Sequence, residues 1–358
     1  MPTRSQPWPA EFTRSAGRDR DLALCRAQLS NGSRTFLAAS LLLPGAVRDP
    51  ACALYAFCRE ADDAVDTQGA PVEQAVLALH ERLDRVYQGL PCTRAADRAL
   101  ARVVHQFAIP RALPAALLEG FEWDAAQRRY ATLESLCDYA ARVAGAVGAM
   151  MALLMGVRSA EGLARACDLG VAMQLSNIAR DVGEDARMGR LYLPLQWLDE
   201  AGIDADAWLA DPQFTPALAS VTARLLQAAD QLYARVDAGI ALLPVACRPG
   251  INAARQLYAE IGHEVKRRGF NSVDGRAVVS PARKVRVLLG ALLSPLLLTP
   301  TAWRQGRAEP ALPSVQFLVD AGSATLLPDA AAAPGRIVWL IALFERLERR
   351  DLQAAGRH

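Results

Sequence analysis

The sequence predicts an all-α protein. Ala and Leu dominate the chain, whereas the aromatic residues make up only 6% of it, and this composition favours helices over strands. Long helical patterns follow one another directly and are interrupted by Pro and Gly, as at 69–71 and 110–114. No internal repeat or long linker divides the 358 residues, 52% of which are hydrophobic. The chain is therefore long and apolar enough for one large helical domain.

The helices are expected in the following order. Asp49 and Pro50 predict a helix start, with Asp49 as the N-cap and Pro50 in the first turn, and the helix continues over 51–65, where no strand-like alternation occurs. Further helices are expected over 132–156, 160–185, 215–242 and 251–266. Residues beyond 308 give no clear pattern until 336–349, which has the pattern of an amphipathic helix.

The stretch 143–157 is hydrophobic on every side and carries no acidic residue. A helix of this kind belongs in the interior of a protein. Its many small residues allow close packing against a neighbouring helix, or leave room for an apolar ligand. The sequence alone leaves both interpretations open.

Charge and cysteine usage exclude several classes of protein. The net charge of +2 is too small for a general nucleic-acid binder. None of the seven cysteines forms a CxxC pair, which is typical of reduced cysteines in a cytosolic protein. Residues 1–21 contain no apolar signal-peptide core, so we expect a cytoplasmic protein.

Two clusters of polar residues interrupt apolar segments. They consist of Arg59, Asp62 and Asp66, and of Asn177, Asp181 and Asp185. The first cluster has the spacing i, i+3, i+7, and the second has i, i+4, i+8, with each residue about 6 Å further along the helix axis. Each cluster therefore places its side chains on one face of a helix.

A divalent cation explains why these acidic residues stand together. Like charges four residues apart destabilise a helix, and half-buried carboxylates without a partner are costly. Ligands that are all oxygen favour Mg²⁺, or Mn²⁺ as a substitute, and Mg²⁺ usually shares substrate phosphates. Two facing acidic helices with metal ions between them would bind a diphosphate. Arg59 and Arg180, which lie within the clusters, would supply the cations that such a ligand needs.

One stretch suggests a membrane contact. Residues 287–303 are apolar and are flanked by Arg283, Lys284, Arg286, Arg304 and Arg307. The stretch is shorter than the roughly 20 residues of a spanning helix and contains Pro295. We expect either a buried helix followed by a loop or a patch that lies on the membrane surface.

Several motifs together resemble the squalene/phytoene synthase family, and most closely its bacterial phytoene synthase branch. The two acidic motifs of that family resemble 54–66 (LYAFCREADDAVD) and 174–187 (QLSNIARDVGEDAR), the second followed by 189–194 (GRLYLP). Between them, 129–130 (RY) and 139–145 (YAARVAG) match the middle segment of the family. Residues 32–36 (GSRTF) resemble its Ser-x-Ser-Phe element with Thr in place of the second Ser, and 258–276 resembles its late segment. The ordered set covers about residues 25–290.

The resemblance implies a single-domain helical fold of the isoprenoid-synthase type around a central cavity. It implies a flexible tail over 1–20, the catalytic domain over 21–300, and a C-terminal extension over 301–358. Carried over by position, the metal ligands are Asp62, Asp66, Asn177, Asp181 and Asp185, with Asp63 assisting. The substrate-binding residues are Ser33, Thr35, Phe36, Arg59, Asn177, Arg180, Tyr258 and Arg276. Tyr139, and with less support Tyr130, would lie near the reacting carbons.

The resemblance also implies a reaction. Two molecules of geranylgeranyl diphosphate would condense head to head, with Mg²⁺ and without NADPH, through a cyclopropylcarbinyl diphosphate. Tyr139 would assist proton movement or stabilise a cationic carbon, and the sequence leaves both roles open. The expected partners are this substrate, other enzymes of the carotenoid pathway and the inner face of the cytoplasmic membrane, but no nucleic acid.

Three other interpretations remain open at this point. A squalene or dehydrosqualene synthase would use C15 farnesyl diphosphate in the same fold. A di-iron carboxylate bundle would use the ExxH pattern of Glu260 and His263, but that architecture requires a second such pattern. A non-catalytic scaffold relative would have lost the aspartates, whereas both acidic motifs are complete here.

Overall fold

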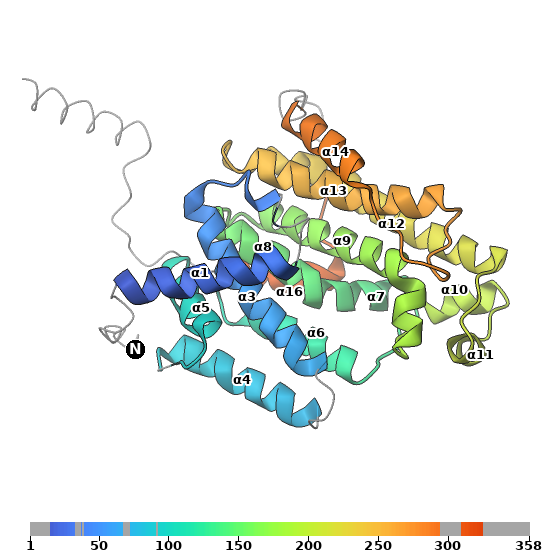
Figure 1. Cartoon of the computed structure of the whole chain (residues 1–358), viewed down its shortest axis with the longest axis horizontal. Coiled ribbons are helices and arrows are strands. Elements are labelled where there is room, and N and C mark those ends of the chain that lie inside the picture. Colours follow the sequence, from blue (N-terminus) through green and yellow to red (C-terminus); the bar gives the residue numbers. More distant parts are fainter. Residues whose placement is uncertain are drawn as a thin grey trace, which may run out of the picture. The chain divides into compact units, whose positions relative to one another are not determined.

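The computed structural model describes residues 15–32, 37, 39–66, 72–90, 92–293 and 309–324. Every regular element in these ranges is helical, as predicted (Figure 1). The elements are α1 (Ser15–Gly32), α3 (Gly45–Asp66), α4 (Val72–Gln88), α5 (Ala95–Gln106), α6 (Ala112–Ala125), α7 (Leu133–Ala140), the π-helix η2 (Ala141–Gly145), α8 (Ala146–Leu154), α9 (Ala160–Arg187), α10 (Leu195–Glu200), α11 (Ala205–Ala210), α12 (Pro216–Ile240), α13 (Arg248–Arg267), α14 (Pro281–Leu293), the 3₁₀-helix η4 (Pro313–Val315) and α16 (Gln316–Ser323).

Helix α9 is the centre of the fold. It is 28 residues long and is capped by Ser159, whose hydroxyl accepts a hydrogen bond from the Gly162 amide at 3.2 Å. It packs against α12, α8, η2, α13 and α16 (Figure 1). Most of its apolar side chains are buried. The predicted helix 160–185 is thus confirmed, with two more residues at its end.

The predicted helix 132–156 is one continuous helical run, α7–η2–α8, with a single π turn in its middle. Among the described residues, 133–154 is the one helical run that is long and apolar enough to span a membrane. However, 61% of its most apolar stretch is buried inside the protein. Its backbone touches α9 at two glycines. A Cβ at Gly148 would lie 2.2 Å from the Ala166 carbonyl oxygen, and one at Gly170 equally close to that of Ala144. Only glycine permits this approach, so close packing explains these two glycines, while small residues of the same run also line an apolar cavity.

The predicted helix start at Asp49 and Pro50 is wrong. Helix α3 begins at Gly45, and Pro50 lies within it. The first turn closes on the residue before the helix, because the amides of Val47 and Arg48 both donate to the Pro44 carbonyl at 2.9 Å. The helix continues through Pro50, although proline has no amide hydrogen to donate to the preceding turn. The other helix ends agree with the prediction within three residues.

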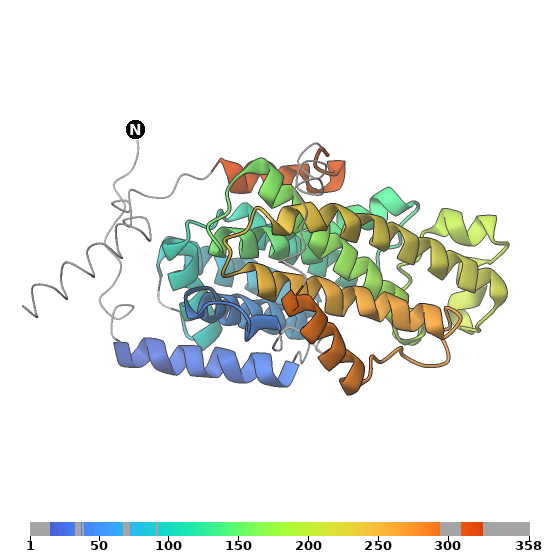
Figure 2. The ribbon, with the colours of Figure 1, turned by 90° about the horizontal axis from the view of Figure 1, so that it is seen from above.

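The two ends of the described chain extend the helical core. Helix α1 starts at Ser15, inside the stretch 1–20 that was expected to be a flexible tail. The elements η4 and α16 were not predicted, and α16 packs against α9, α8 and α6. In Figure 2, α16 lies on the opposite side of the helices from α1 and α14. The predicted helix 336–349 lies outside the described residues, and the division at 300 stays a prediction.

A buried ion-pair cluster fastens the segment before α16 to α9. Asp168 and Arg165 are almost fully buried, and both Arg165 (3.0 Å) and Arg235 (2.9 Å) contact the Asp168 carboxylate. The same two guanidinium groups donate to main-chain carbonyls of Glu309 and Pro310. Residues 309–310 are therefore packed against α9 and α12.

Candidate active site

The first acidic cluster lies at the C-terminal end of α3. Arg59 contacts Asp62 at 3.4 Å and Asp63 at 2.6 Å, and Asp62 is about two fifths exposed. Asp66 is the last residue of the helix, and its side chain lies outside the described part of the structure. The predicted stripe is therefore seen for Arg59 and Asp62, which both line a cavity.

The second cluster lies in the C-terminal half of α9. Arg180 donates two hydrogen bonds to its neighbour Asp181, at 2.8 and 2.6 Å. One turn further on, burial raises the pKa of Asp185 to about 7, and the charge of Asp181 adds to the shift. The Oδ1 atom of Asn177 is buried and has no hydrogen-bond partner among the described residues.

A fifth carboxylate, Asp124 of α6, connects the two clusters. Burial raises its pKa to about 6, against the effect of hydrogen bonds from Tyr192 (2.7 Å) and Tyr139 (2.8 Å), and the charge of Asp62 adds to the shift. The charge of Asp124 in turn contributes to the raised pKa of Asp185. Asp124 is therefore within electrostatic reach of both clusters, which supports the prediction that the two acidic helices face one shared region.

Two adjoining cavities form the hollow centre of the fold. A polar one of about 270 Å³ is lined by Arg59, Asp62, Asp124 and Tyr139. An apolar one of about 220 Å³ runs along α8, α9, α12 and α13, and Asn177 and Tyr258 are in its wall. The two share lining residues, namely Val143, Val147 and Gln174. A cavity lined by charged residues thus adjoins an apolar one. This agrees with the prediction of a cavity inside the helical fold.

The donor set fits a divalent cation, although it is not a complete cage. Among the side chains that the structure describes, no three His, Cys, Asp or Glu residues lie close enough together to bind one metal ion. The side chain of Asp66 is outside the described part of the structure and is not included in this statement. The Oδ1 of Asn177 is a buried acceptor without a donor, and burial raises the pKa of Asp185, so both oxygen groups lack, among the described residues, a partner that would fully offset the cost of their burial. Oxygen ligands of this kind suit Mg²⁺.

The loop between α13 and α14 carries Arg276 to the second cluster. Its guanidinium contacts Asp181 at 2.8 Å and Glu184 at 3.5 Å. The loop is docked on α9, because the buried Ser272 hydroxyl donates to the Ala179 carbonyl at 2.6 Å and the Gly183 amide donates to the Ser272 carbonyl at 3.1 Å. A Cβ at Gly183 would lie 2.3 Å from the Val273 carbonyl oxygen, so this position requires glycine.

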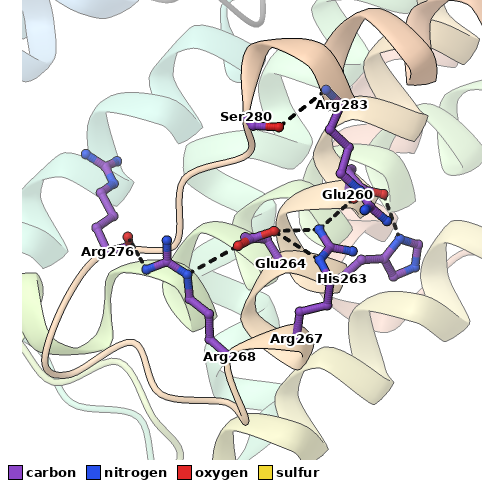
Figure 3. A network of polar contacts seen from close by, with 8 residues as sticks. All are labelled: Glu260, His263, Glu264, Arg267, Arg268, Arg276, Ser280 and Arg283. Atoms are coloured by element: carbon purple, nitrogen blue, oxygen red, sulfur yellow. Dashed lines mark hydrogen bonds and ion pairs between the residues drawn. The ribbon is translucent and has the colours of Figure 1, made fainter.

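Arg268 holds the same loop from the other side. It donates to the main-chain carbonyl of Arg276 at 2.9 Å and to the Glu264 carboxylate at 3.3 Å, as Figure 3 shows. Its neighbour Arg267 instead pairs with Glu264 (2.6 Å) and Glu260 (2.8 Å), both on α13. Arg268 therefore contacts the loop that carries Arg276, whereas the ion pairs of Arg267 stay within α13.

The remaining predicted residues divide into three groups. Tyr139 and Tyr258 line the cavities. Tyr130 is fully buried, and its ring lies 5.3 Å from that of Tyr139. Ser33, Thr35 and Phe36 lie outside the described residues and are not tested. The carboxylate of Glu260, the acidic member of the ExxH pattern, is bound by Arg267, Arg283 and His263, so its oxygens are already paired with cationic side chains.

The sequence analysis missed Asp124 and did not single out Tyr192. Asp124 is an isolated carboxylate, without an acidic partner three or four residues away on a helical face, so the pattern that identified the other aspartates does not reveal it. Tyr192 lies in the matched segment 189–194, but only the fold brings its hydroxyl to Asp124.

The chain is similar to known proteins over most of its length. The profile of the family described as squalene/phytoene synthase matches residues 29–283. The phytoene synthase of Rhodobacter capsulatus is 50% identical over 92% of this chain and 97% of its own. The phytoene synthase of Cereibacter sphaeroides is 50% identical over 93% of this chain and 95% of its own. The crystal structure of a dehydrosqualene synthase in complex with a ligand is 30% identical, with a TM-score of 0.72 over 79% of this chain and 99% of its own.

Proposed function

The chain belongs to the squalene/phytoene synthase family, and from this we propose that it is a phytoene synthase of carotenoid biosynthesis. It joins two molecules of geranylgeranyl diphosphate head to head and releases diphosphate. The observation that carries the proposal is the cavity, in which a chamber lined by Arg59 and Asp62 adjoins an apolar one. Two bacterial proteins that are 50% identical in sequence to this chain, and are matched over 95% or more of their own length, are phytoene synthases.

The reaction begins with cleavage of the allylic C–O bond, which separates a carbocation from the diphosphate anion. Arg59, Arg180 and Arg276 would bind the diphosphate oxygens and stabilise the charge that develops on them. Their contacts with the two acidic clusters support this role. In the structure, all three pair with aspartates of the two clusters. Binding the diphosphate would therefore exchange these contacts for contacts to the ligand.

Asp62, Asp66, Asn177, Asp181 and Asp185 are the residues that would hold Mg²⁺. When bound, the ions neutralise the charge that builds up on the leaving diphosphate. The buried state of Asp185 and Asp124 supports this assignment, since burial raises the pKa of both groups and the neighbouring charges of Asp181 and Asp62 add to the shifts.

The apolar chamber protects the carbocation. Its wall is made of aliphatic and sulfur-containing side chains such as Val147, Met151 and Leu169, which exclude the water that would trap the cation as an alcohol. The cation adds to the double bond of the second chain, and loss of a proton then closes the cyclopropane ring of prephytoene diphosphate, a cyclopropylcarbinyl ester. A second ionisation, rearrangement and loss of a proton give phytoene.

A synthase that uses the C15 substrate is the second candidate, because the solved relative at 30% identity is a dehydrosqualene synthase. An assay of the purified protein with Mg²⁺ would separate the two. We expect a C40 product from geranylgeranyl diphosphate, with or without NADPH. A C30 product from farnesyl diphosphate at a higher kcat/KM would instead establish the second candidate.

We propose further that the enzyme works in the cytoplasm with peripheral contact to the membrane. Helix α14 supports this, because it exposes Val285 and Leu289, each more than half exposed, beside Lys284 and Arg286. An apolar face next to basic side chains suits an anionic lipid surface. Flotation with anionic liposomes should carry the protein, and the variant V285E/L289E should remain behind. Flotation of neither protein would refute the contact.

A further inference from the structure

Asp124 has no role in the reaction as described so far, although it lies on the wall of the polar chamber beside Asp62 and Tyr139. Both of its carboxylate oxygens are occupied. The Tyr139 hydroxyl donates to Oδ2 at 2.8 Å, and the Tyr192 hydroxyl donates to Oδ1 at 2.7 Å. A carboxylate that accepts two tyrosine hydroxyls fixes the direction of both O–H bonds.

The direction of the Tyr139 O–H bond determines what this residue can offer to a ligand. Because its hydrogen points to Asp124, the Tyr139 oxygen has only its lone pairs for other neighbours, and the Tyr192 hydroxyl is one of these neighbours. Burial raises the pKa of Tyr139 well above its ordinary value, and the charge of Asp124 adds to the shift, so the phenol stays neutral. Tyr139, which lines the chamber, can therefore act on a group there only as an acceptor with a partial negative charge.

The surrounding rings hold this arrangement in place. The Tyr139 ring stacks on that of Tyr192 with centroids 5.2 Å apart, and Tyr130 lies 5.3 Å from Tyr139 and 6.3 Å from Tyr192. Tyr130 and Tyr192 come from segments on either side of α9 in the sequence. The rings of Tyr130 and Tyr192 both pack against Tyr139, so the rotation of its hydroxyl group is the main freedom that Asp124 restricts.

We propose that Asp124 is a positioning residue, which holds the Tyr139 hydroxyl so that its oxygen lone pairs face the cationic carbon of the bound prenyl chain. The inference rests on the proposed function. It also decides between the two roles open to Tyr139, in favour of stabilising the cation. A dipole that is already oriented toward the developing charge lowers the barrier without a cost of reorganisation during the reaction.

The test compares four variants of the full-length enzyme with geranylgeranyl diphosphate and Mg²⁺. Asp124→Leu removes both acceptors at similar size, and Asp124→Asn is a milder change that keeps one acceptor oxygen. Tyr139→Phe removes the hydroxyl itself, and the double variant D124L/Y139F completes the cycle. For each, kcat, KM and the released products are measured.

We expect kcat of D124L to fall by about 10- to 100-fold while KM stays within about twofold, because the groups that bind the diphosphate are untouched. More of the product should leave as a prenyl alcohol or as the cyclopropyl diphosphate. D124N should show a smaller loss. The double variant should be no slower than Y139F, since Asp124 acts through Tyr139.

The control for a merely structural effect is Asp97→Asn, which weakens another buried ion pair, with Arg82 on the neighbouring α4. It should lower Tm but leave kcat of the folded enzyme unchanged. The proposal is overturned if D124L keeps the wild-type kcat. It is also overturned if adding D124L to Y139F lowers kcat by as much as D124L lowers it in the wild-type enzyme. A D124L variant that loses Mg²⁺-dependent thermal stabilisation would make Asp124 a metal ligand and also overturn it. A wild-type enzyme without C40 product would refute the proposed function instead.

Discussion

The guanidinium of Arg276 lies 2.8 Å from the Asp181 carboxylate, although the two residues are 95 positions apart in the chain. Asp181 also binds Arg180, so one predicted metal ligand holds two predicted diphosphate-binding cations. The two functions therefore share one cluster, and the position of the Arg276 loop determines how the cluster is built.

The first prediction concerns Arg268. Replacing it with Gln removes the hydrogen bond to the Arg276 carbonyl and the ion pair with Glu264, so the loop loses its support on the side of α13. We expect KM for the prenyl diphosphate, and the inhibition constant of inorganic diphosphate, to rise by about tenfold, because a charge-assisted hydrogen bond contributes about 1.5–3 kcal/mol.

Arg267→Gln is the matched control, because Arg267 pairs with Glu264 and Glu260 on its own helix. It should change KM by no more than about twofold. In the background of Arg276→Ala, Arg268→Gln should have no further effect on KM. Equal effects of R267Q and R268Q would show that only the stability of α13 matters.

The second prediction concerns the carboxylates of the two clusters. Asp62→Ala and Asp181→Ala should each reduce turnover by at least about 100-fold, because each removes a ligand that would neutralise the leaving diphosphate. Far-UV circular dichroism should keep its helical signal, since Asp62 is partly exposed and neither residue belongs to the buried core. Near-wild-type activity in either variant would remove that residue from the metal site.

Helical periodicity made the long elements and the two acidic clusters predictable. The apolar pattern gave the start of α9 at residue 160 and the interior position of residues 143–157, because a helix buried on all sides must be apolar on all sides. The spacing of Asp181 and Asp185 fixed their common face for the same reason.

What joins distant segments could not be predicted in this way. Asp124 receives its two tyrosine partners only in the folded chain, and nothing in its neighbourhood repeats with a helical period. The Arg276 loop docks on α9 because the backbone of Val273 comes close to Gly183. In the sequence, such a contact is marked only by a glycine. Pro50 misled the prediction because the helix starts one turn earlier, on the Pro44 carbonyl.

The third prediction is a pH dependence of stability in the absence of metal. In the folded protein the pKa of Asp185 is raised to about 7 and that of Asp124 to about 6, both from 3.8, chiefly by burial. Between pH 4 and 7 the folded state therefore binds more protons than the unfolded chain, so the free energy of unfolding falls as the pH rises. Each pKa unit corresponds to about 1.4 kcal/mol.

In EDTA, Tm should accordingly be higher at pH 5 than at pH 8. Mg²⁺ should raise Tm more at pH 8 than at pH 5, because its ligands must be deprotonated. Asp185→Asn should flatten both dependences. If D185N and the wild type respond alike to pH and to Mg²⁺, Asp185 does not carry the effect.

The last prediction concerns the length of the prenyl chain. Ala254 of α13 and Ala166 of α9 line the apolar chamber, and both are small enough to leave its volume to a ligand. Ala254→Phe would fill part of a cavity of only about 220 Å³ and should exclude the longer substrate first. The ratio of kcat/KM for the C20 diphosphate to that for the C15 diphosphate should fall at least tenfold, since a single methylene in an apolar pocket already discriminates by about 10- to 200-fold. Ala254→Ser, which keeps the volume, should retain the wild-type ratio. An A254F variant that is folded by its Tm but loses both substrates in the same proportion would show that the prenyl chain does not lie against α13.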